Sequence, residues 1–172
     1  MHYGRIVALV GVVAGAAGLF IKKASSEGEG ALAQLSQLPD SPFPSDLVEN
    51  TGSALYNDTA WAAIVFGLAA LVAIVVAFMP PLGQPMKRLY GLTATVMGVV
   101  MLLIGIFATL GAMDDADTLT AGFAQAAAAG AIPVAFTVSI GFGWYLLVLG
   151  GAIVAIGGVL SLMARPDEDA LA

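Results

Sequence analysis

The sequence predicts an all-α membrane protein, namely a left-handed four-helix transmembrane bundle with a small outer cap formed by two long loops. Hydrophobic residues make up 59% of the 172 residues and charged residues only 10%, whereas soluble domains carry about 25% charged residues. About 20 apolar residues suffice for a helix to cross the hydrocarbon of a bilayer. Four apolar stretches with uncharged interiors reach or approach this length, at about 5–21, 60–80, 89–113 and 137–164. Little chain lies outside them, so residues 1–172 are expected to form one membrane domain.

The first stretch has the length of a secretion signal and follows a basic residue, Arg5. Small residues would favour cleavage after such a stretch, but Lys22 and Lys23 stand there instead. We therefore interpret 5–21 as a retained first span with Arg5 at its border.

The orientation follows from the basic residues, which accumulate in short cytoplasmic loops. Four of the six lie on one side of an up-and-down bundle, namely Arg5, Lys87, Arg88 and Arg165. This distribution predicts a multi-pass membrane protein with both termini in the cytoplasm. The abundance of alanine, valine and glycine is consistent with a bacterium, so the expected location is the bacterial plasma membrane. The loops at about 22–59 and 114–136 then lie outside.

Both outer loops carry patterns typical of short helices. In the first loop, Leu32, Leu35 and Leu38 are three residues apart and form one apolar stripe. In the second loop, the alanine-rich segment Thr118–Ala129 favours a separate helix with Asp117 as its N-cap. We expect the two loops to fold on each other as the outer cap. The alternative is a pair of helices lying in the headgroup layer.

Small residues repeat at intervals of seven in the four spans, a pattern that lets membrane helices approach closely and cross with left-handed geometry. The glycines expected at helix–helix contacts are Gly11, Gly15, Gly67, Gly98, Gly105, Gly150 and Gly157. The paired glycines at 150–151 and 157–158 also permit a different interpretation, a helix interrupted at a transport site.

Aromatic residues near span ends are typical of the membrane interface. Trp61, Trp144 and Tyr145 are therefore expected to be interface anchors, and Phe66 is expected to face lipid or the interface. A binding role for the pair Trp144 and Tyr145 is the alternative.

Chemically reactive residues are scarce, and we expect neither a catalytic site nor a bound cofactor or metal ion. The sequence has no cysteine and a single histidine, His2. The spans at about 60–80, 89–113 and 137–164 contain no charged residue, which argues against a pump. The net charge of −6 argues against nucleic acid as a partner. The acidic run Asp114, Asp115 and Asp117 offers oxygen ligands for Ca²⁺, but helix capping and solvation explain it as well.

The layout resembles claudin-like and tetraspan membrane proteins, by topology alone. Its shared features are cytoplasmic termini, a long first outer loop, a short inner turn and a smaller second outer loop. The segment GFGWYL at 141–146, followed by the glycine pair at 150–151, looks like the last span of small actinobacterial membrane proteins of unassigned function.

These features favour a non-catalytic interaction protein, an accessory or assembly subunit of a larger bacterial membrane complex. Membrane lipids and other membrane subunits are the expected partners, and a homo-oligomer is possible. The alternatives are a lipid or small-ligand binder and a self-assembling small channel. The expected partner surface lies on the outer loops and comprises Leu32, Leu35, Leu38, Phe43, Asp114, Asp115 and Asp117. A purely structural alternative is that the leucine stripe packs against Phe123.

Overall fold

The computed structural model describes residues 3–21, 24–26, 60–79, 87–132 and 134–163. Within these ranges the chain forms four helices: α1 (Tyr3–Phe20), α4 (Ala60–Phe78), α5 (Arg88–Ala128) and α6 (Phe142–Met163). Two three-residue strands, β1 (Ala24–Ser26) and β2 (Val138–Ile140), pair antiparallel. All four helices are long and apolar enough to cross a membrane, so the prediction of four membrane-length helices is confirmed.

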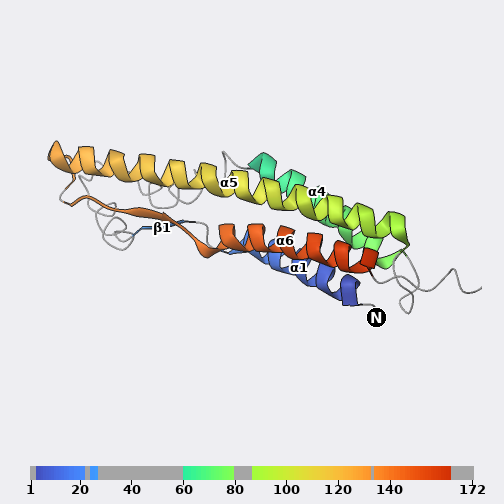
Figure 1. Ribbon diagram of the computed structural model, residues 1–172. Coiled ribbons are helices and arrows are strands. Elements are labelled where there is room, and N and C mark those ends of the chain that lie inside the picture. Colours follow the sequence, from blue (N-terminus) through green and yellow to red (C-terminus); the bar gives the residue numbers. More distant parts are fainter. Residues whose placement is uncertain (1–2, 22–23, 27–59, 80–86, 133, 164–172) are drawn as a thin grey trace, which may run out of the picture.

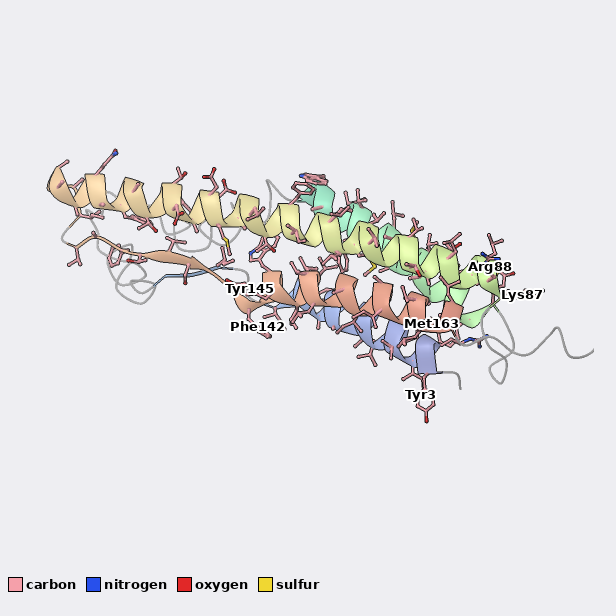
Figure 2. All side chains as sticks on the ribbon, viewed as in Figure 1. Tyr3, Lys87, Arg88, Phe142, Tyr145 and Met163 are labelled. Atoms are coloured by element: carbon pink, nitrogen blue, oxygen red, sulfur yellow. The ribbon has the colours of Figure 1, made fainter. Side chains whose placement is uncertain are left out.

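Consecutive helices run in opposite directions and lie side by side (Figure 1). The first and last helices, α1 and α6, pack along each other, α5 packs on α6, and α4 packs mainly on α5 and also on α1. One end of the bundle gathers the ends of three helices, marked in Figure 2 by Tyr3 of α1, by Arg88 of α5 with its N-cap Lys87, and by Met163 of α6. The start of α1 and the end of α6 therefore share one end, as the predicted topology requires. Which side of a membrane this end meets stays a prediction.

Large apolar side chains cover the outward faces of the bundle. Val13 is 68% exposed, Ile64 64% and Leu103 48%. A soluble monomer rarely exposes such continuous apolar surface, because contact with water is unfavourable. These faces suit contact with lipid, and four candidate membrane-spanning helices indicate a multi-pass membrane protein.

Helix α5 is longer than the sequence predicted. It runs for 41 residues without a break, which corresponds to about 60 Å, twice the hydrocarbon thickness. The separate helix expected at Thr118–Ala129 is therefore wrong, because the third helix continues past 113, where the membrane span was expected to end. Asp117 lies in the middle of the helix and does not cap it. An aspartate inside a helix costs only a few tenths of a kcal/mol, which the surrounding alanines offset.

The end of α5 follows from one glycine. Gly130 has φ +73°, a left-handed conformation that favours glycine. The amide of Gly130 donates to the carbonyl of Ala127 at 3.0 Å, and the amide of Ala131 donates to that of Ala126 at 2.9 Å. These two bonds form the Schellman arrangement that ends many helices, and the C-cap is Ala129, the residue at which the predicted segment Thr118–Ala129 ends.

Helix α6 starts later than the sequence predicted. The fourth span was expected from Thr137, but the helix begins at Phe142 and Val138–Ile140 form β2 instead. Valine and isoleucine fit extended chain well, and β1 supplies the partner, with Ala24 opposite Ile140 and Ser26 opposite Val138. The segment after α1 and the segment before α6 therefore meet, which periodicity alone did not reveal.

Candidate functional site

The seam between α1 and α6 is built on glycine at intervals of seven. A Cβ atom added at Gly11 would lie 2.6 Å from the backbone nitrogen of Val154. One added at Gly150 would lie 2.6 Å from the Cα atom of Gly15. Ordinary contacts between carbon atoms need about 3.5–4.0 Å, so no larger residue fits at either position without separating the helices. Gly157 continues the seam one heptad further, 2.7 Å from the carbonyl oxygen of Gly4 by the same measure.

The seam between α5 and α6 is also built on glycines at close contacts. A Cβ atom at Gly98 would lie 2.6 Å from the Cα atom of Ala155, and one at Gly105 would lie 3.1 Å from the backbone nitrogen of Val148. On α6, Gly151 faces Leu102 of α5, whereas its neighbour Gly150 faces α1. Each glycine of this pair thus serves a different seam. Helix α6 is continuous through both glycine pairs, so their role is packing rather than an interrupted transport helix. The left-handed crossing stays a prediction.

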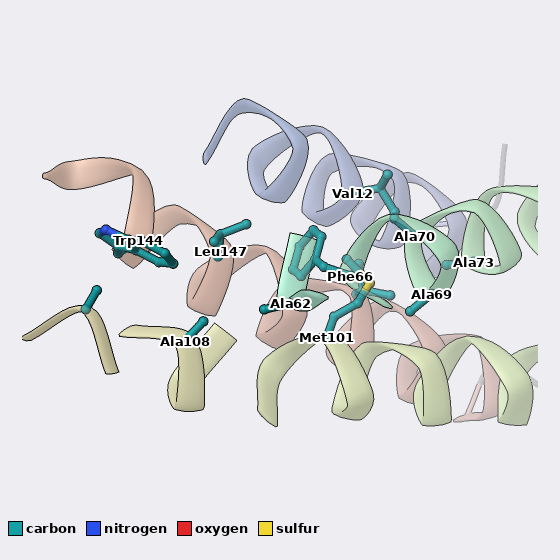
Figure 3. Packing of buried hydrophobic residues seen from close by; sticks show 12 residues of the cluster. Val12, Ala62, Phe66, Ala69, Ala70, Ala73, Met101, Ala108, Trp144 and Leu147 are labelled. Atoms are coloured by element: carbon teal, nitrogen blue, oxygen red, sulfur yellow. The ribbon is translucent and has the colours of Figure 1, made fainter. Parts of the chain in front are cut away.

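Gly67 does not lie at a close contact, and its predicted packing role is wrong. Among the described residues, no heavy atom of another element lies within 4 Å of a Cβ atom built there. Helix α4 instead packs through Phe66, which is 1% exposed and was expected to face lipid or the interface. Its ring lies against Gly15 of α1, because glycine leaves the space that the ring occupies (Figure 3).

The prediction of Trp144 as an interface anchor is also wrong. Its side chain is 1% exposed and belongs to the main apolar cluster, near Leu147 and Ala108 (Figure 3). Trp144 lies three residues before Leu147, and both side chains belong to the buried face of α6. Trp61 and Tyr145 are 54% and 44% exposed, which is the exposure that an interface anchor requires.

Arg5 lies inside the first turn of α1 rather than at its border. The helix begins at Tyr3, and Arg5 is fully buried. A guanidinium group therefore resides within the protein two residues after Tyr3, which lies at the same end of the bundle as Lys87 and Arg88 (Figure 2). Periodicity could not show this, because an arginine next to an apolar run resembles a flanking charge.

The most distinctive feature is a projection that we call the outer arm, residues 114–132 together with 134–140. Helix α5 carries it beyond the start of α6 (Figure 1). The segment that returns toward α6 packs along the helix through an edge-to-face pair of Phe123 and Phe136, with ring centroids 5.9 Å apart. Ile132, 3% exposed, completes this small cluster.

A hydrogen-bonded threonine ties the returning segment to the helix. The amide of Val138 donates to the hydroxyl of Thr120 at 3.0 Å. The same hydroxyl donates to the carbonyl of Ala116 at 2.9 Å, within the helix. The arm is thus supported by two layers of contact, apolar near its tip and polar near β2.

The acidic residues of the predicted partner surface lie at the base of the arm. Asp114 and Asp117 are exposed and Asp115 is half-buried. The apolar half of that surface, Leu32, Leu35, Leu38 and Phe43, lies outside the described residues, and so does the leucine stripe proposed to pack on Phe123. Among the residues described, no three His, Asp or Glu side chains are placed to hold a metal ion together.

An apolar groove of about 380 Å³ lies on the lateral surface between α5 and α6. Its lining residues are Ile106, Thr109, Leu110, Tyr145, Val148 and Leu149. The Thr109 hydroxyl donates to the carbonyl of Gly105 at 2.7 Å and lies 3.4 Å from the carbonyl of Trp144, so its single hydrogen is engaged within the protein. Sequence reasoning missed this groove, because its residues have the same apolar character as the other exposed positions of the two helices.

Comparison of the chain with protein-family models, with curated proteins and with solved structures finds no match. The functional argument therefore rests on the bundle, the outer arm and the groove. The class that these features define is a multi-pass membrane protein with four candidate spans.

Proposed function

We propose that the protein is a non-catalytic accessory or assembly subunit of a larger bacterial membrane complex, and that the outer arm is its recognition surface. The observation that carries this proposal is the uninterrupted length of α5, whose last 15 residues, Asp114–Ala128, project by about 22 Å. A helix supported along one side by a packed segment presents its other side in a fixed position. Binding residues are commonly placed on such supports.

The exposed side of the arm indicates the chemistry of the partner. Asp114 and Asp117 give its base a negative charge, and small residues such as Ala121 and Ala124 follow toward the tip. Small side chains allow another backbone to approach closely, and carboxylates attract a basic segment. The proposed partner is therefore a membrane subunit with a basic segment on the same side. Cytoplasmic termini, the bacterial plasma membrane and the claudin-like layout belong to this proposal.

Site-specific photo-crosslinking in cells tests the proposal. A photoreactive amino acid at Ala121 or Ala124 should join the protein to one partner of fixed stoichiometry. The matched control is the same amino acid at Leu103, which is exposed on the lateral surface of α5, and it should give no such product.

A second experiment tests the contribution of charge. Replacing Asp114, Asp115 and Asp117 together by Asn should lower the yield of the Ala121 product by about threefold to tenfold, since each exposed ion pair contributes up to about 1 kcal/mol. Products that form at Leu103 but not at Ala121 or Ala124 would place the partner on the lipid-facing helices and contradict the proposal. A product that consists of the chain joined to itself would favour a homo-oligomer instead.

A further inference from the structure

The groove between α5 and α6 lies at a definite depth relative to the two charged ends of α5. From Arg88 to Leu110, the groove residue nearest the arm, the helix rises by about 33 Å, close to the hydrocarbon thickness of about 30 Å. With Arg88 placed at one hydrocarbon boundary, Leu110 lies near the other boundary, on the side of the arm. The groove opens laterally within the membrane, just inside that boundary.

The walls of the groove do not suit a transmembrane helix. Wherever helices of this protein approach most closely, one of them contributes a glycine, as at Gly98 and Gly150. None of the six lining residues is glycine or alanine, and most are large. The groove spans only residues 106–110 and 145–149, little more than one helical turn on each side. A thin, flexible hydrocarbon chain fits such a surface better than a second helix does.

The rim of the groove is polar on the side toward the arm. Asp114 and Asp117 lie four and seven residues beyond Leu110 on the same face of α5, so they lie about 6 Å and 10 Å further along the helix. The headgroup layer occupies about 5–8 Å on each side of the hydrocarbon, which places both carboxylates at or just above headgroup depth. Tyr145 is half-exposed on the opposite wall (Figure 2), and side chains in a helix lean toward its N-terminus, which for α6 is the same side.

We propose that this groove binds an acyl chain of a phospholipid whose headgroup carries an ammonium group, with Asp114 and Asp117 attracting that group. Charge selects the lipid: two carboxylates favour phosphatidylethanolamine and disfavour the anionic phosphatidylglycerol. This inference uses two of the carboxylates that the proposed function also uses, but the two are tested separately, because lipid binding is measured on the purified chain without a partner.

Native mass spectrometry of the full chain in mild detergent tests the inference, with equimolar phosphatidylethanolamine and phosphatidylglycerol added. The chain should retain one lipid, with phosphatidylethanolamine favoured at least fivefold. Asp114→Asn with Asp117→Asn should lower this preference to about twofold or less and leave the total bound lipid unchanged, because exposed charge pairs are weak individually. Asp115→Asn is the charge control, since Asp115 points to another side of α5, and it should keep the preference.

Filling the groove tests its location. Leu110→Trp should lower the total bound lipid at least fivefold, whereas Phe107→Trp, at a 64% exposed position outside the groove, should leave it unchanged. A phosphatidylethanolamine with a photoreactive acyl chain should crosslink to Ile106, Leu110 or Leu149 of the unmodified chain, a result that does not depend on how a variant folds. Equal binding of both lipids, crosslinks confined to other surfaces, or a co-purified protein crosslinked at Leu110 in place of lipid would overturn the inference.

Discussion

Substituting alanine for single glycines should destabilise or stabilise the bundle according to the seam that each glycine faces. At Gly150 the added Cβ atom would lie 2.6 Å from the Cα and N atoms of Gly15 and 2.8 Å from the carbonyl oxygen of Gly11. Restoring a contact distance of about 3.5 Å requires α1 and α6 to separate by nearly 1 Å, which forfeits a quarter to a half of the dispersion energy along the seam. Overpacking of this kind costs about 1–3 kcal/mol. Gly150→Leu should cost more.

Gly67 provides the matched control, because it lies in a span and has open space around it. Gly67→Ala should be neutral or stabilise by up to about 1 kcal/mol, since alanine loses less backbone entropy in a helix. The assay is the free energy of unfolding in mixed micelles, measured by titration with a denaturing detergent. If Gly150→Ala is as stable as the parent, or if Gly67→Ala is the more damaging change, the assignment of the seams is refuted.

Two further substitutions test the core and the arm. Trp144→Ala should lower the free energy of unfolding by about 3–5 kcal/mol, because it empties a buried site. Trp61→Ala, at a 54% exposed position, should change the free energy of unfolding by less than about 0.5 kcal/mol. Similar losses for the two variants would mean that the indole of Trp144 is not buried. Thr120→Val removes the acceptor of the Val138 amide, at a cost of about 1–3 kcal/mol, and should speed hydrogen exchange of that amide about tenfold or more. Exposed Thr118→Val should leave that exchange rate unchanged, and an equal effect of both changes would contradict the bracing role of Thr120.

Membrane-length helices and their packing glycines could be predicted because both have strong local signals. An uncharged run of about 20 residues has few explanations other than a span, and a seven-residue repeat of small residues marks one face of a helix. The structure places Gly11, Gly15, Gly98, Gly105, Gly150 and Gly157 at close helix–helix contacts. Gly67 fits the same repeat but does not lie at such a contact. The repeat identifies one face of a helix and does not show whether another helix covers that face.

The aromatic residues show a second limit. Trp144 and Tyr145 are adjacent, yet one is buried and the other is half-exposed. The rule for interface aromatics depends on depth in the membrane and ignores the rotation of a helix about its axis. The prediction that Phe66 faces lipid or the interface was wrong for a related reason. The space that accepts its ring is created by Gly15, on a distant part of the chain.

The outer arm was missed because local charge was interpreted as a boundary. Asp114, Asp115 and Asp117 end the apolar run, which marks the end of the membrane span but not the end of the helix. The alanine-rich sequence that follows them maintains the helix until shortly before Gly130. The pairing of β1 with β2 joins residues more than 100 positions apart, and no pattern within either segment predicts such a contact.

The distance between spin labels on Val99 and Gln125 tests the outer arm most directly. The chain has no cysteine of its own, so two introduced cysteines can be labelled without interference, and both positions are exposed on α5. In lipid nanodiscs, an uninterrupted helix predicts a narrow distribution centred at about 39 Å between the two backbone positions, from 26 residues at 1.5 Å each. A broad distribution, or one centred below about 30 Å, would mean that the helix bends over the bundle near Asp114, and it would contradict the existence of a projecting arm.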